Sequence, residues 1–157
     1  MSDPTSTDRA NRVPWPPIID VVALAGALTL DRLVPLPALI FEGWQIWGLL
    51  IAAAGLGIAV LGLGAFQRAR TTFVPNRPAT ALATGGIYKV TRNPMYLGVL
   101  VLFVGLGLAI KSGWLLVAVP LVAYALQKLA IEREEAYLTR RFGEAYLAYC
   151  AKVRRWV

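Results

Sequence analysis

Two polar motifs lie at the open ends of an apolar hairpin. The first motif, residues 92–98, contains an arginine, an asparagine and a tyrosine, and the second motif, residues 132–135, contains three glutamates and an arginine. The arms between them, 95–110 and 114–131, have sixteen and eighteen residues, and at about 1.5 Å per residue each arm approaches the roughly 30 Å of a bilayer core. We therefore expect both motifs at one membrane face. Charged and amide groups are costly beside hydrocarbon, which indicates a site for a polar molecule.

The composition predicts an all-α integral membrane protein. The chain is 57% hydrophobic and only 16% charged, and two further apolar runs occupy residues 18–40 and 44–66. With the two hairpin arms, these runs predict about four transmembrane helices. At this length we expect a single domain, 1–157, whose motif-bearing part is 85–157.

The first apolar run is less regular than the others. Asp31 and Arg32 interrupt it and Pro35 and Pro37 follow, so a tilted or broken helix of about 18 to 20 residues is expected. A cleaved signal peptide is the alternative interpretation of this run. Asp20 inside the supposed apolar core argues against that alternative.

Basic residues alternate between the predicted loops. They are frequent before the first run, in loop 67–92 and after residue 131, and sparse elsewhere. The positive-inside rule then places both termini in the cytoplasm, and in the cytoplasmic membrane if the source is bacterial. The net charge of +7 is accounted for by this topology and by anionic membrane lipids, so no nucleic-acid partner is expected and protein partners stay unknown.

The tail after residue 131 predicts an amphipathic helix at the cytoplasmic surface. Apolar and aromatic residues recur there at helical spacing: Leu138, Phe142, Tyr146, Tyr149 and Val153. One interpretation is a helix that lies on the membrane surface without a role in the site. The other is a helix that forms a lid over the site between the two motifs.

Several absences restrict the chemistry. The chain has no histidine and one cysteine, Cys150, which excludes a histidine general base and indicates no metal site. Cys150 is interpreted as a bystander, and no phosphate-binding loop is present. The glycine pairs at 55–57, 62–64 and 105–107 lie inside apolar runs, where they predict close helix packing.

Methyl transfer from S-adenosylmethionine fits a site of this composition. The leaving group is a neutral thioether, so no acid is required, and alignment and exclusion of water can provide the catalysis. Carboxylates and aromatic faces suit the cationic groups and hydroxyls of the cofactor, and arginine suits its carboxylate.

The residues around the hairpin also carry a resemblance. The segment 86–98, followed after the hairpin by Glu134, Glu135 and the aromatic tail, resembles the superfamily of isoprenylcysteine carboxyl methyltransferases and phospholipid methyltransferases. The resemblance covers residues 85–157 and implies S-adenosylmethionine as cofactor and a lipophilic acceptor from the bilayer: a lipid amine, a prenyl-cysteine carboxylate or a thiol. Asn93 stands where the isoprenylcysteine enzymes usually have histidine, which favours a lipid amine.

On this basis we predict the site residues. Arg92 and Tyr96 are the predicted catalytic residues, with Arg92 orienting an anionic group of the acceptor. The predicted cofactor-binding residues are Tyr88, Asn93, Pro94, Tyr96, Leu97, Gly98, Glu134, Glu135 and Tyr146.

Structural explanations compete with each of these roles. Arg92 can anchor the topology, Tyr96 can belong to an interfacial aromatic belt, and Asn93 can begin a helix ahead of a proline. Glu132 and Glu135 can form salt bridges within their helix. For the whole chain, the alternatives are a non-catalytic membrane adaptor and a lipid reductase using a nicotinamide cofactor.

Overall fold

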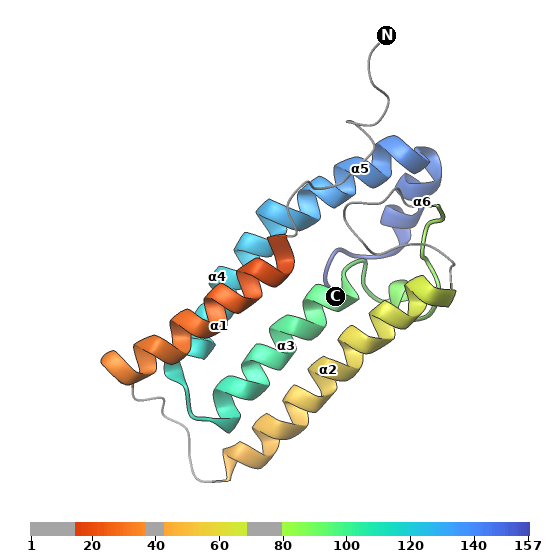
Figure 1. The fold of residues 1–157 in the computed structure, drawn as a ribbon. Coiled ribbons are helices and arrows are strands. Elements are labelled where there is room, and N and C mark those ends of the chain that lie inside the picture. The colour runs from red at the N-terminus through yellow and green to blue at the C-terminus, as the bar shows by residue number, and fades with distance from the viewer. Residues whose placement is uncertain (1–14, 37–42, 69–79) are drawn as a thin grey trace.

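The computed structural model describes residues 15–36, 43–68 and 80–157, and within these ranges every regular element is helical. The helices that lie side by side in Figure 1 are α1 (Trp15–Leu33), α2 (Trp44–Arg68), α3 (Pro94–Ala109) and α4 (Gly113–Leu126). A short 3-10 helix, η1 (Gly86–Lys89), precedes α3. The prediction of an all-α chain is confirmed for the described residues. Residues 69–79 of loop 67–92, which the sequence predicts to be long and basic, lie outside them.

The helix of α4 continues beyond the bundle. It passes through a π-helical turn, η2 (Gln127–Ile131), into α5 (Glu132–Phe142), and the amide of Glu132 donates to the carbonyl of Gln127, five residues earlier. A turn closed in this way holds an extra residue and rotates everything that follows it relative to an uninterrupted α-helix. The second motif therefore faces a direction that α-helical spacing alone does not give.

A sharp bend at Gly143 separates α5 from α6 (Glu144–Lys152). Gly143 has φ 53° and ψ −127°, a conformation that glycine adopts without steric cost. In Figure 1, α6 folds back beside the ends of α2 and α3. The tail after residue 131 is therefore helical but bent into two helices, and a single amphipathic helix at the membrane surface stays a prediction.

Two helices are long and apolar enough to cross a membrane by length and composition. They are α2, with 25 residues and mean hydropathy 2.4, and the continuous helix Gly113–Phe142, with 30 residues and mean hydropathy 1.8. Helix α3 has 16 residues, and α1 carries Asp20, Asp31 and Arg32. Four crossings therefore stay a prediction. Helix α1 has 19 residues and ends before Pro35, in agreement with the expected length of about 18 to 20 residues.

Glycines bring α2 and α3 into direct backbone contact. A Cβ added to Gly48 would lie 2.4 Å from the amide nitrogen of Ala109, and one added to Gly55 would lie 2.4 Å from that of Leu102. From the other side, a Cβ on Gly105 would lie 2.2 Å from the amide nitrogen of Ala52. Glycines that recur every seven residues let the two antiparallel backbones approach closely. This is the packing predicted for apolar helices, whose association in lipid rests on van der Waals contact.

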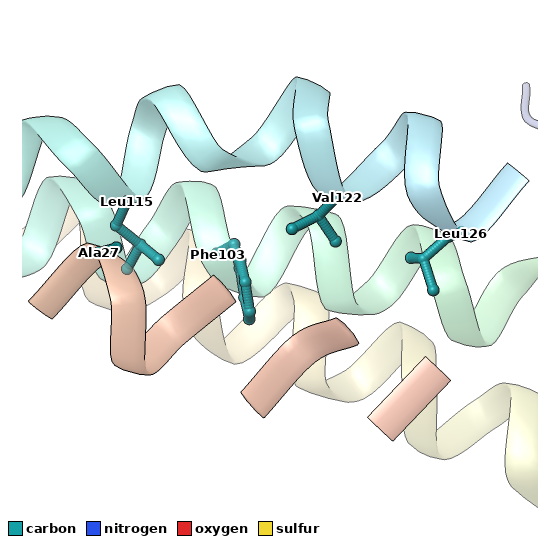
Figure 2. Close-up of a cluster of buried hydrophobic side chains, with 5 residues drawn as sticks. All are labelled: Ala27, Phe103, Leu115, Val122 and Leu126. Carbon is teal, nitrogen blue, oxygen red and sulfur yellow. The ribbon is translucent and has the colours of Figure 1, made fainter. Parts of the chain in front are cut away.

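A separate apolar cluster joins α3 to α4 and α1. Its buried members are Ala27, Phe103, Leu115, Val122 and Leu126, drawn in Figure 2. Leu115 and Leu126 have no exposed surface. Helix α3 is thus packed by backbone contact on the α2 side and by large side chains on the α4 side. Its amino-terminal end, which carries the first motif, is fixed by both neighbours.

We predict that Gly105→Ala destabilises the protein whereas Gly64→Ala does not. The added methyl at Gly105 meets the backbone of α2, while nothing lies within 4 Å of a Cβ on Gly64. Overpacking of this kind costs about 1 to 3 kcal/mol. Thermal unfolding in detergent should show a midpoint several degrees lower for Gly105→Ala only. Equal midpoints for the two variants would contradict the glycine contact.

Candidate functional site

The two motifs meet at one end of the helix bundle. The hydroxyl of Tyr96 in α3 donates to Oε1 of Glu134 in α5 at 2.5 Å. Nη1 of Arg92 lies 3.3 Å from Oε1 of Glu135. The hairpin therefore brings together the residues that the sequence predicts to converge, although 38 residues separate Tyr96 from Glu134.

Glu135 is held by two arginines. Besides Arg92, it accepts from Nε of Arg155 at 3.0 Å and from Nη2 of Arg155 at 2.6 Å, one bond on each carboxylate oxygen. This two-pronged geometry is the strong form of an arginine–carboxylate pair. The side chains of Glu135 and Arg92 are only 18% and 16% exposed, so water screens their attraction weakly.

The C-terminal segment 153–157 is tied to the first motif through its main chain. The carbonyl of Arg154 accepts from the amide of Arg92 at 3.0 Å. The carbonyl of Arg155 accepts from Oγ1 of Thr91 at 3.1 Å and from Nδ2 of Asn93 at 3.0 Å. Arg155 thus touches both motifs at once, the first through its carbonyl and the second through its guanidinium.

The residues at the start of α3 also have structural roles. Asn93 occupies the N-cap position and Pro94 the first helical position, as predicted, but the Asn93 side chain makes no capping bond because it donates to Arg155. A Cβ on Gly98 would lie 2.6 Å from the amide nitrogen of Ala59 in α2, so Gly98 serves helix packing. Leu97 continues the helix, its amide donating to the carbonyl of Asn93.

Aromatic residues of α6 form another wall of the site. Tyr146 is 3% exposed, and Tyr149 donates its hydroxyl to the carbonyl of Tyr88 at 2.7 Å. Burial raises the pKa of Tyr149 to about 12, against the opposing effect of the nearby Arg92 charge. Burial raises the pKa of Tyr88 and Tyr146 as well. These phenols stay protonated near neutral pH and act as hydrogen-bond donors rather than bases.

Two buried polar atoms near the motifs have no hydrogen-bond partner among the described residues. They are Nε of Arg92, a donor, and Oδ1 of Asp20 in α1, an acceptor. Asp20 interacts electrostatically with Tyr96, so it lies on the same side of the bundle as the motifs. A molecule with a hydrogen-bond acceptor for the arginine Nε and a cationic group for the aspartate oxygen fits these two unpaired atoms. Among the described residues, no group of three or more histidine, cysteine or acidic side chains is arranged to hold a metal ion.

Some residues of this site were not predicted from the sequence. Arg155 lies in the basic tail, whose charge predicted only the topology. Asp20 lies in the first apolar run, where it was only an argument against a signal peptide. Cys150, interpreted as a bystander, accepts from Nη1 of Arg92 at 2.7 Å. An isolated carboxylate inside a membrane helix is the one signal that could have pointed to Asp20.

The fold and the candidate site define an apolar helical bundle, suited to a membrane, with a cluster of polar residues at one end. The model of the family described as phospholipid methyltransferase matches residues 44–145, more than half of the chain. The chain belongs to this family, and it is accordingly a methyltransferase associated with membranes and lipids. This confirms the resemblance read from the motifs.

One curated relative is similar over a shorter stretch. A protein of Haemophilus influenzae, described as uncharacterized, is 33% identical over 63 residues, which is 40% of this chain and the whole of that relative. No solved structure matches the chain.

We predict that Arg155→Ala loosens the C-terminal segment, because both hydrogen bonds to Glu135 are lost. The pair is partly exposed, with Arg155 34% accessible, so the expected loss is about 1 kcal/mol. Hydrogen exchange of the amides around residue 155 should accelerate about fivefold. Arg154→Ala is the matched control, since its exposed side chain leaves the carbonyl contact in place. Unchanged exchange in Arg155→Ala would show that the main-chain bonds hold the segment alone.

Proposed function

We propose that this protein transfers a methyl group from S-adenosylmethionine to a lipophilic acceptor that enters the site from the bilayer. The observation that carries the proposal is the convergence of the two motifs, with Tyr96 bonded to Glu134 and Arg92 paired with Glu135. Family membership supports methyl transfer and a lipid-like substrate. The cofactor and the acceptor are our own inference from the site.

The side chains at the site fit the polar groups of this cofactor. When bound, S-adenosylmethionine supplies a methyl group on a sulfonium, and the product is a neutral thioether, so the site needs no general acid. Glu134 and Glu135 keep free lone pairs, because a carboxylate accepts about four hydrogen bonds. We assign them to the hydroxyls and the ammonium of the cofactor. The buried phenol of Tyr146 supports the same pocket, and Tyr88, Asn93, Pro94, Leu97 and Gly98 complete it.

Arg92 is proposed to orient an anionic group of the acceptor. Its Nη1 is engaged by Glu135 and Cys150, which fixes the plane of the guanidinium and leaves Nε open. A guanidinium held in this way offers a directed donor at little entropic cost. Tyr96 is proposed to shape the cofactor side of the same space, because its hydroxyl is committed to Glu134.

We further infer that both termini face the cytoplasm, where the cofactor is made. The alternation of basic residues between loops supports this orientation. The site would then open toward the cytoplasm from α5 and α6 and toward lipid from the helices.

Cofactor binding separates this proposal from the two alternatives. A non-catalytic adaptor would bind neither S-adenosylmethionine nor a nicotinamide cofactor, and a lipid reductase would bind the nicotinamide. The family match favours the methyltransferase over both.

We predict that the purified protein binds S-adenosylmethionine and S-adenosylhomocysteine, and that Glu135→Ala weakens binding by about 1 to 3 kcal/mol because a charged hydrogen-bond partner is lost. Glu132→Ala is the matched control. Glu132 lies one helical turn from Glu135, and its partner is the exposed Lys128 at 2.8 Å. Isothermal calorimetry in detergent should separate the two variants. No heat with either ligand in the wild type would remove the methyltransferase proposal.

We predict that Arg92→Ala lowers turnover at least tenfold, equal to about 1.4 kcal/mol in the barrier, while cofactor affinity changes little. Arg92→Lys should restore only part of the rate, since an ammonium cannot reproduce planar, two-pronged contacts. Transfer of labelled methyl groups to a membrane lipid extract measures turnover, with the exposed Arg140→Ala as control. Full activity in Arg92→Ala would show that Arg92 serves only as a topology anchor. A loss of cofactor affinity as large as the loss of rate would show that Arg92 binds the cofactor and not the acceptor.

A further inference from the structure

A polar pocket lies at the opposite end of the bundle from the two motifs. It has a volume of about 320 Å³ and lies between the end of α1 and the turn from α3 to α4. Its polar lining consists of Asp31, Arg32, Lys111 and Ser112, and the remainder is aliphatic, including Leu28 and Ile110. At this end of the described helices, Arg32 and Lys111 are the basic residues, and both line this one pocket.

The walls of the pocket are joined by three contacts. Ser112 donates its hydroxyl to Oδ2 of Asp31, and Trp114 donates its Nε1 to the carbonyl of Val34 at 2.7 Å. A Cβ on Gly113 would lie 2.8 Å from the carbonyl of Leu36, so the two segments touch without a side chain between them. Within the described residues, no hydrogen bond or ion pair engages the side chain of Arg32 or Lys111.

Lys111 has an unusual backbone conformation for a lysine. Its φ is 57°, and the bonds from Lys111 to Leu108 and from Ser112 to Gly107 close α3 in the manner that normally places glycine at this position. A residue with a side chain pays a steric cost there. Outliers of this kind are a reason to look for a function of the side chain, and here that side chain lines the pocket.

The depth of the pocket in a membrane follows from tryptophans at the same end of the helices. Trp44 is the first residue of α2 and Trp114 the second of α4, and Trp44 and Trp47 are 45% and 62% exposed. Tryptophans concentrate at the level of lipid headgroups. Two cations and one carboxylate, Asp31, line the pocket beside aliphatic residues. A net positive charge next to an aliphatic lining, at that level, matches a lipid phosphate and the acyl chains attached to it.

We propose that this pocket binds the phosphate of a glycerophospholipid, with Arg32 and Lys111 holding the anionic oxygens and the aliphatic lining contacting the glycerol end of the acyl chains. The lipid would join α1 to the α3–α4 turn. One wall, α1, lies outside residues 44–145, which match the family. The site is independent of the methyl-transfer proposal, because its test does not measure activity.

The test is thermal unfolding of the intact protein in an uncharged detergent, with phosphatidylglycerol added to the micelles. Saturating lipid should raise the unfolding midpoint of the wild type by about 5 °C. The double variant Arg32→Gln, Lys111→Gly should need at least tenfold more lipid for half of that shift. Lys111→Gly is chosen because glycine suits the left-handed conformation, so the variant should fold normally without lipid. Lys152→Gln, at the other end of the molecule, is the control and should behave as the wild type.

Two further arms distinguish the source of the phosphate. Diacylglycerol, which lacks phosphate, and inorganic phosphate, which lacks acyl chains, should each give less than a third of the shift. An equal shift with inorganic phosphate alone would overturn the lipid proposal in favour of a soluble anion. An equal lipid response in the wild type and the double variant, or no response in the wild type, would overturn the pocket as the site.

Discussion

Close contact between the backbones of α2 and α3 is the constraint on which the rest of this structure depends. Helix α3 lies between α2 and α4, and it carries the first motif at its amino-terminal end. In lipid there is little hydrophobic gain from joining two apolar helices, so the association must come from the number and closeness of van der Waals contacts. Glycines at 48, 55, 98 and 105 provide that closeness. The position of Arg92 and Tyr96 is thus set by residues that carry no functional group.

Given a fixed α3, the C-terminal segment completes the site. Arg155 accepts from Thr91 and Asn93 with its carbonyl and donates to Glu135 with its guanidinium. Glu135 then lies between Arg92 and Arg155. The three side chains together carry a charge of +1, whereas Glu135 alone carries −1. A carboxylate balanced in this way is held rigidly, which suits a group that has to present its remaining lone pairs in fixed directions. It also leaves net positive charge for an anionic group of a ligand.

The sequence predicted much of this arrangement. The apolar runs predicted the helices, and the irregular first run predicted a helix of about the length that α1 has. The glycine pairs predicted close packing, which Gly55 and Gly105 make, whereas nothing lies within 4 Å of a Cβ on Gly57 or Gly64. The spacing of the hairpin predicted that the two motifs would meet, and the bond between Tyr96 and Glu134 is one of the contacts they make. Arg155 was not predicted, because its role depends on a chain end folding back across 62 residues to Asn93. Nor was the direction of the second motif, since the π-helical turn before Glu132 breaks the α-helical period.

The two adjacent glutamates of α5 contact different parts of the chain. Adjacent residues on an α-helix point about 100° apart, so Glu134 and Glu135 reach different side chains of the protein. Glu134 accepts from Tyr96 on α3, whereas Glu135 binds Arg155 of the C-terminal segment. The doublet therefore links α5 to two different parts of the chain, and Nε of Arg92, whose Nη1 pairs with Glu135, is buried without a hydrogen-bond partner among the described residues. Replacing either glutamate alone removes one link and leaves the other, so the two variants should differ in which side of the site they loosen.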